Sequence, residues 1–139
     1  MIVTEDIIAE KFAEYNRQYF DCDLPTPDFG LYRGYKFCGL FSCDKIIGRR
    51  YLKKTKIEIS YYYDWNEDDL RDVLVHEMIH YYLAYKHIGN QITHGEAFHS
   101  MADEFNEKYG MNITERIDIS KYKRAPNAPM LSWLIAKWF

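Results

Sequence analysis

The sequence NEDDLRDVLVHEMIHYYLAYKHIG, residues Asn66–Gly89, decides the fold prediction for this chain. Asn66 is a favourable helix N-cap, and the acidic residues that follow it suit the positive end of a helix dipole. Apolar side chains then recur at the spacing of one helix face, at Leu70, Leu74, Met78 and Tyr81. The pattern predicts a helix that begins after Asn66 and ends near Gly89.

Two histidines inside this predicted helix form an H-E-x-x-H motif, HEMIH at residues 76–80. Residues four positions apart lie on one helix face, about 6 Å apart along the axis, so both imidazoles can bind one metal ion. Glu77 lies beside them, close enough to deprotonate a water at the metal without being a ligand. The motif therefore indicates hydrolysis assisted by a metal, and a zinc site of this kind needs a third protein ligand.

His94 is the strongest candidate for that third ligand. His87 lies seven residues beyond His80, about 10 Å farther along the helix, which is too far for zinc–nitrogen bonds near 2.0 Å. His94 follows a loop that is long enough to turn the chain back, and it lies just before the next predicted helix. Glu96, as a carboxylate ligand, and His99 remain as alternatives.

Other signals place this helix in an α+β fold. Thr4 is a favourable N-cap for a first amphipathic helix, and the prolines of Leu24–Asp28 predict a turn. Strand-like runs follow at residues 29–32, 36–42 and 51–60. Gly95–Tyr109 predicts another helix, with Gly110 as its C-cap. We expect an N-terminal helix, a small antiparallel sheet, the active-site helix, and a second helix that carries the third metal ligand.

Length and composition suit one domain. The chain has 139 residues, of which 47% are hydrophobic and 28% charged, as is usual for a globular protein of this size. We expect a single domain over residues 1–139, with a core over 4–110 and an extended C-terminal tail over 111–139. The net charge of −3 argues against a globally basic nucleic-acid-binding protein.

The cysteines and the lengths of the hydrophobic runs indicate the cellular compartment of the protein. The three cysteines include no C-x-x-C pair, which is typical of reduced intracellular thiols. The N-terminus is acidic and lacks the features of a signal peptide. No apolar run reaches the roughly 20 residues that span a bilayer. We therefore expect a cytoplasmic protein that does not bind membranes.

Basic and aromatic clusters have two interpretations each. Residues 49–56, RRYLKKTK, and residues 121–124, KYKR, could contact phosphates or an acidic substrate. We favour solvated faces for both clusters, because the overall charge is negative. The rings of residues 61–65, YYYDW, could line a substrate or base-stacking surface. We favour packing of the sheet against a helix for these rings.

Two further residues are candidates for supporting roles near the metal. Asp72 lies one turn before His76, so its carboxylate could accept a hydrogen bond from that imidazole. The commoner role of such a residue is a solvated helix acid. Tyr122 is a candidate for stabilising an oxyanion.

Several segments, in this order, resemble the SprT-like family, which includes the Spartan proteases. The opening segment has Asn16-x-x-Tyr19-Phe20 followed by Leu24-Pro25, and KIEIS at residues 56–60 resembles the strand before the active-site helix. HEMIH at residues 76–80 matches the core motif. Residues 93–98, THGEAF, running on to Phe105-Asn106, resemble the segment of the third ligand. This last block makes the resemblance specific, because H-E-x-x-H alone is shared by all zincins.

The resemblance implies a zincin-like fold and a zinc-dependent metallopeptidase that hydrolyses peptide bonds of proteins. It implies zinc ligands at His76, His80 and His94, with Glu77 as general base and acid. Eukaryotic relatives cleave proteins crosslinked to DNA and need DNA for activity, so DNA-associated proteins are candidate substrates. Many bacterial relatives carry a C-terminal four-cysteine zinc ribbon, and this sequence departs from that pattern in having no cysteine after Cys43. The alternative is a zinc-containing DNA-binding or scaffold module with little hydrolytic activity.

Overall fold

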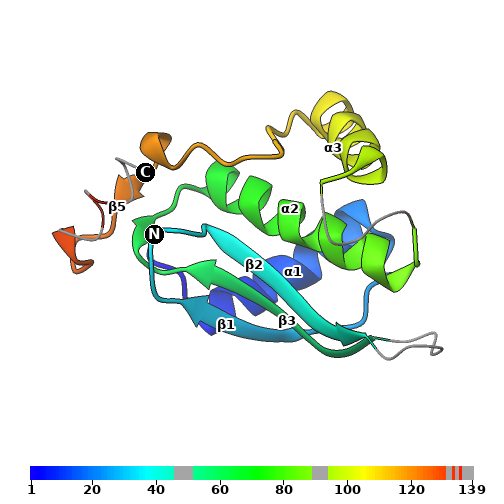
Figure 1. Cartoon of the computed structure of the whole chain (residues 1–139), viewed down its shortest axis with the longest axis horizontal. Coiled ribbons are helices and arrows are strands. Elements are labelled where there is room, and N and C mark those ends of the chain that lie inside the picture. Colours follow the sequence, from blue (N-terminus) through cyan, green and yellow to red (C-terminus); the bar gives the residue numbers. More distant parts are fainter. Residues whose placement is uncertain (46–51, 89–93, 131–132, 134, 136–139) are drawn as a thin grey trace.

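The computed structural model describes residues 1–45, 52–88, 94–130, 133 and 135, and the described part is an α+β arrangement of three α-helices and a small sheet (Figure 1). The elements are α1 (Glu5–Tyr19), β1 (Asp28–Tyr32), β2 (Gly39–Lys45), β3 (Leu52–Ser60), β4 (Tyr63–Asp64), α2 (Glu67–Tyr85), α3 (Glu96–Tyr109), the 3-10 helix η1 (Ile119–Lys121) and β5 (Lys123–Arg124). This order confirms the α+β prediction.

The helices begin and end where the capping residues predict. The Thr4 hydroxyl accepts a hydrogen bond from the Ile7 N–H at 3.2 Å, and Asn66 Oδ1 accepts one from the Asp69 N–H at 2.7 Å. Gly110 ends α3 with φ +67°, a left-handed conformation that glycine adopts without strain. Helix α2 ends at Tyr85, earlier than predicted. None of the helices in the described ranges is both long and apolar enough to cross a membrane.

The three main strands form a mixed sheet in the order β1-β3-β2. Strand β2 is antiparallel to β3, whereas β1 is parallel to β3. The prediction of an antiparallel sheet was therefore wrong for one of the two pairings. The reason is topological: β3 returns antiparallel beside β2 and inserts between β2 and β1, which gives β3 the direction of β1. Hydrophobic alternation predicts which residues of a strand are buried but not which strand lies next to it.

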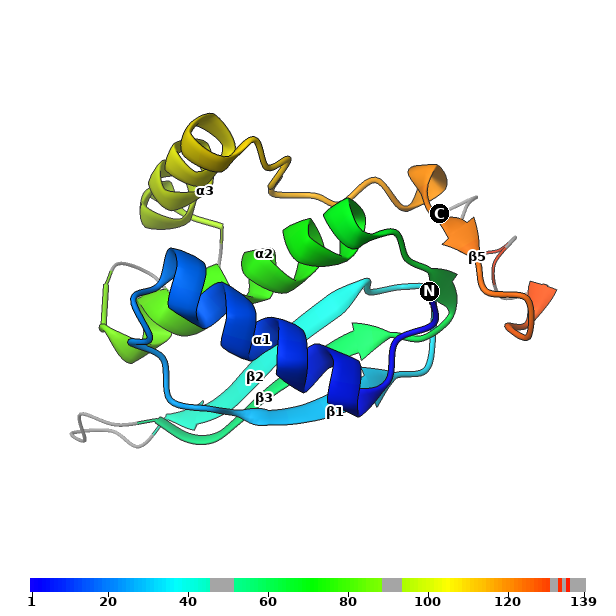
Figure 2. The ribbon, with the colours of Figure 1, turned by 180° about the vertical axis from the view of Figure 1, so that it is seen from behind.

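One face of this sheet is buried under helices. Ile57 and Ile59 of β3 are fully buried, while Lys56 and Glu58, which alternate with them, face the more exposed side, as the alternation predicts. Helix α1 packs along β1, and α2 packs along β2 and β3. Figure 2, the view from behind, shows α1 running beside the sheet with α2 beyond it. Helix α2 is buried on most of its surface, which places the H-E-x-x-H motif in the interior.

After α3 the chain runs back along α2 through residues 111–118, which we call the return segment (Figure 1). Its Met111 and Ile113 are buried in the core. The chain then forms η1 and strand β5, which pairs with β4. The return segment therefore lies beside α2, which also packs against the sheet, α1 and α3.

Candidate metal centre

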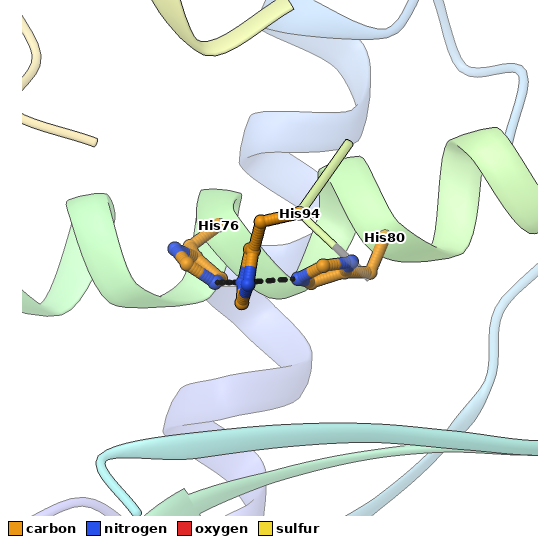
Figure 3. Close-up of side chains that lie close together, drawn as sticks. All are labelled: His76, His80 and His94. Atoms are coloured by element: carbon orange, nitrogen blue, oxygen red, sulfur yellow. Dashed lines mark hydrogen bonds between the residues drawn. The ribbon is translucent and has the colours of Figure 1, made fainter. Parts of the chain in front are cut away.

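The structure brings His76, His80 and His94 together at one point (Figure 3). His76 and His80 project from the same face of α2. The Nε2 atom of His94 lies 3.1 Å from Nε2 of His76 and 3.1 Å from Nε2 of His80. His94 precedes α3, whose first residue is Glu96. The expectation that a second helix carries this residue is therefore corrected: the chain entering α3 carries it, because a side chain there can reach back to α2.

The spacing of these nitrogens fits a single tetrahedral ion. Two ligands of a tetrahedral zinc ion with Zn–N bonds of 2.0–2.1 Å lie about 3.3 Å from each other, close to the separations observed. The candidate ligand atoms of all three residues lie within 4.8 Å of one another. Three nitrogens arranged in this way leave one position of a tetrahedral ion for water or substrate.

Phe98 packs against all three imidazoles. Its ring stacks on that of His80, with centroids 4.7 Å apart and an interplanar angle of 22°. Its centroid lies 4.8 Å from the ring centroids of both His76 and His94. Phe98 is 1% exposed, so it is itself tightly packed. Its contacts with the three imidazole rings therefore restrict their orientation. The sequence placed Phe98 on the buried side of its helix but gave no sign of this contact.

The three imidazoles are neutral at neutral pH. Burial is the main cause that lowers the pKa of His76 to about 3 and the pKa of His80 to about 4, with neighbouring histidines adding to the effect. Burial also lowers the pKa of His94. Neutral imidazoles keep a free lone pair, which is the form that binds a metal ion.

Glu77 lies beside this cluster as a buried carboxyl group. Its side chain is 8% exposed, and its Oε2 atom lies 3.9 Å from Nε2 of His76. Burial raises its pKa to about 8, and a hydrogen bond with the Phe41 backbone partly opposes that shift. A carboxyl group with a pKa near neutrality can both accept and return a proton.

A cleft of about 590 Å³ opens onto the cluster. It is lined by the three histidines, Glu77, residues 36–40, residues 115–117 and Ile119. Strand β2 is an edge strand in this sheet. The Ser60 N–H donates to the Cys38 carbonyl across the β2–β3 pair, so the backbone of Gly39, the next residue, points away from β3. The cleft therefore has unpaired strand backbone along one wall.

Gly39 allows β2 to lie directly against α2. A Cβ atom at this position would lie 3.1 Å from Glu77 Cγ, 3.1 Å from Val73 Cγ1 and 3.2 Å from Ile59 Cδ1. A side chain here would therefore press on Glu77 or separate the strand from the helix. The sequence gave no signal for this contact, because it depends on how two distant segments pack.

The other candidate ligands lie outside the three-histidine cluster. His87 is exposed just after the end of α2. Glu96 is exposed in the first turn of α3. His99 is also exposed, and its Nε2 lies 3.4 Å from Glu115 Oε2. Of the described residues that could hold a metal, only His94 joins His76 and His80.

Asp72 and Tyr122 have structural partners instead of the expected ones. Asp72 Oδ1 accepts a hydrogen bond from Arg71 at 3.0 Å, and Asp72 Oδ2 accepts one from the Asn112 N–H at 3.2 Å. Tyr122 is buried with its ring against Tyr63 and Trp65. It is not among the residues that line the cleft.

The basic and aromatic clusters mostly take structural roles. Residues 49–51 lie outside the described residues. Lys54 pairs with Asp44 at 3.6 Å. The guanidinium of Arg124 donates to the Ala128 carbonyl at 2.7 Å. Tyr62, Tyr63 and Trp65 are buried core rings and not an exposed stacking surface. Their ring contacts are with Tyr35 and Tyr122 rather than with the helix that the prediction favoured.

Comparison with known proteins identifies one family. The model of the SprT-like family matches residues 8–118. No curated protein and no solved structure gave a match. The matched range includes most of α1, the three-stranded sheet, α2, α3 and the whole return segment.

Proposed function

Because this chain belongs to the SprT-like family and its three histidines converge beside a buried glutamate, we propose that it is a zinc-dependent metallopeptidase with a zincin-like fold. The proposed ligands are His76, His80 and His94, and the proposed catalytic residue is Glu77. Residues 1–139 form the SprT-like metallopeptidase domain in this proposal. The observation that carries it is the position of Glu77, 3.9 Å from a ligand nitrogen and next to an open cleft.

Zinc bound at this point would polarise the scissile carbonyl, lower the pKa of the attacking water and stabilise the negative charge that develops on the carbonyl oxygen. Glu77 accepts the proton of that water and then delivers it to the leaving amine. Its pKa of about 8 without a nearby cation falls when positive charge is close, which makes Glu77 a base at neutral pH. Phe98 keeps the three imidazoles in position throughout.

The substrate binds as an extended strand along β2 in this proposal. The backbone of Gly39 is free to pair with it, since neither its N–H nor its C=O points toward β3. Pairing of this kind, known as β-augmentation, selects extended or unfolded segments and holds them by main-chain hydrogen bonds. The cleft lined by Gly39, His76 and Glu77 would then lie beside the scissile bond.

The resemblance to the Spartan proteases extends the proposal to proteins that are bound to DNA. The decisive experiment incubates the zinc-loaded chain with an unfolded protein such as casein, with and without single-stranded DNA, and identifies the products by mass spectrometry. Glu77→Gln, which should retain zinc, and His94→Ala, which should lose it, serve as matched controls. We expect cleavage by the unmodified chain and none by either variant.

Dependence of that cleavage on DNA would support substrates associated with DNA. Zinc binding without cleavage under either condition would overturn the peptidase proposal. It would favour the alternative, a zinc-containing DNA-binding or scaffold module.

A further inference from the structure

His76 contributes one ring nitrogen to the cluster and directs the other into the protein. Its Nε2 faces His94 at 3.1 Å. Its Nδ1 is buried and has no hydrogen-bond partner among the described residues. A neutral imidazole carries a hydrogen on only one nitrogen, so a free lone pair on Nε2 requires the hydrogen on Nδ1. The groups that face Nδ1 therefore decide whether His76 is ready to bind a metal.

Nδ1 belongs to the side of His76 that meets the return segment. A void of about 10 Å³ lies between α2 and this segment, and Asp72, His76 and Thr114 are among the residues that line it. A void of this size holds at most one water molecule. Thr114 lines this void together with His76, and a backbone carbonyl is a common acceptor for the second ring nitrogen of a metal-binding histidine. The Thr114 carbonyl is therefore a candidate acceptor for the Nδ1 hydrogen.

Two side chains fix the return segment just before Thr114. The Asn106 amide forms two hydrogen bonds with the backbone of Ile113: Nδ2 donates to the carbonyl at 2.9 Å, and Oδ1 accepts from the N–H at 2.7 Å. Asp72 accepts a hydrogen bond from the Asn112 N–H at 3.2 Å. Since Arg71 also binds the Asp72 carboxylate, this anchor is itself held in place.

We propose that Asp72 and Asn106 are positioning residues of the metal centre, because they hold the return segment so that the Thr114 carbonyl accepts the Nδ1 hydrogen of His76. This arrangement keeps the hydrogen on Nδ1 and presents the lone pair of Nε2 to the metal. Neither residue touches metal or substrate. The inference rests on the proposed function only in requiring that the three histidines bind a metal ion.

The test compares zinc affinity in Asp72→Ala, Asn106→Ala and a matched control, Asn16→Ala. Asn16 makes the same pair of hydrogen bonds to the Leu24 backbone, at 2.9 and 3.2 Å, at the end of α1. Its removal costs similar bonds at a position with no contact to His76. Zinc affinity is measured by competition with a chromogenic chelator, and folding is monitored by circular dichroism.

We expect Asp72→Ala and Asn106→Ala to bind zinc about 10- to 100-fold more weakly, the range typical for groups that orient a ligand. Asn16→Ala should keep the affinity of the unmodified chain. Asp72→Asn retains an acceptor for the Asn112 N–H and should recover most of the affinity. Nitrogen-15 NMR of the zinc-loaded chain should show hydrogen on His76 Nδ1, exchanging faster with solvent in the two alanine variants.

Equal loss of affinity in Asn16→Ala and Asn106→Ala would overturn the inference, because it would indicate general destabilisation. Unchanged affinity and exchange in the folded Asp72 and Asn106 variants would overturn it as well. Both readouts are independent of catalysis. A chain that binds zinc but cleaves nothing would therefore contradict the peptidase proposal alone.

Discussion

At the scale of single residues, the burial that suits Glu77 for its proposed catalytic role lowers the stability of the metal-free protein. Its pKa rises from 4.5 to about 8 on folding, so the folded state binds more protons than the unfolded state between these values. The contribution of Glu77 to the unfolding free energy therefore decreases as the pH rises from about 4.5 to about 8. Burial of the Glu77 carboxyl group therefore lowers the stability of the metal-free protein at neutral pH.

Glu77→Gln should abolish cleavage and stabilise the metal-free protein at neutral pH by roughly 1 to 3 kcal/mol. The amide has no charge to lose on burial, so the advantage over the native chain should grow between pH 5 and pH 8. Urea unfolding of both proteins across this range, in the presence of a chelator, measures the difference. A difference that does not change with pH would contradict the assignment of a raised pKa to Glu77.

His76 and His80 create the opposite pH dependence. Their pKa values are about 3 and about 4 in the folded state, against about 6.5 in an unfolded chain. The unfolded state therefore binds more protons in this window, and stability is lost as the pH falls from about 6.5 toward 4. The two histidines together should cost roughly 5 kcal/mol of unfolding free energy over this range, and the opposite contribution of Glu77 should reduce the net loss of the metal-free protein to roughly 3 kcal/mol.

Denaturant unfolding of the metal-free protein between pH 7 and pH 4 measures this loss. His80→Leu should make the pH dependence shallower, because one buried titrating group is removed. If His80→Leu had the same slope as the unmodified chain, the protons would be binding elsewhere.

At the scale of elements, the close contact between β2 and α2 controls the position of Glu77. Gly39→Ala would place a methyl group 3.1 Å from Glu77 Cγ and Val73 Cγ1. Overpacking of this kind costs about 1–3 kcal/mol of stability, and a displaced catalytic group can lose up to about 10²-fold in rate. We expect Gly39→Ala to lower kcat at least tenfold while zinc affinity is preserved.

Gly30→Ala in β1 provides the control for this prediction. A Cβ atom there would lie 2.7 Å from Lys56 Cε, which belongs to the end of a flexible side chain that can move away. Steady-state kinetics and chelator competition on both variants separate the catalytic effect from the metal effect. Equal losses of kcat in the two variants would show that the contact with Glu77 has no special importance.

Elements that depend on local chemistry were predictable from the sequence, and contacts between distant segments were not. Thr4, Asn66 and Gly110 cap their helices as predicted, because each makes a contact within its own turn. The parallel pairing of β1 with β3 was missed, because alternation within a strand says nothing about its neighbour. For the same reason the sequence did not predict the close contact between Gly39 and α2.

The candidate site shows the same division. The spacing of His76 and His80 predicts one helix face, and the position of His94 before a helix favoured it as the partner; the structure brings these three side chains together. Their role as zinc ligands stays a prediction. The two hydrogen bonds between the Asn106 side chain and the Ile113 backbone were not predicted. The sequence does not show which backbone groups an asparagine side chain will contact.

At the scale of the whole molecule, the proposed metal would join two parts of the fold that are otherwise held by packing and a few hydrogen bonds. His76 and His80 belong to α2, which shares its core with the sheet and α1, while His94 belongs to the chain that enters α3. Helix α3 packs against the core through its buried residues Phe98, Ala102 and Phe105. An ion held by all three histidines would therefore act as a cross-link between α2 and α3.

Removal of the metal should therefore destabilise one side of the molecule more than the other. At a free zinc concentration of 100 times Kd, binding contributes about 2.7 kcal/mol to the unfolding free energy, which a chelator should remove. Hydrogen exchange should increase most in α3 and in the return segment, and least in α1 and the sheet, because the metal would add a link through His94 to the former and not to the latter. His94→Ala should show this exchange pattern already with zinc present and should respond little to the chelator. An equal increase in every element would mean that the metal stabilises the fold globally and does not act as a link between α2 and α3.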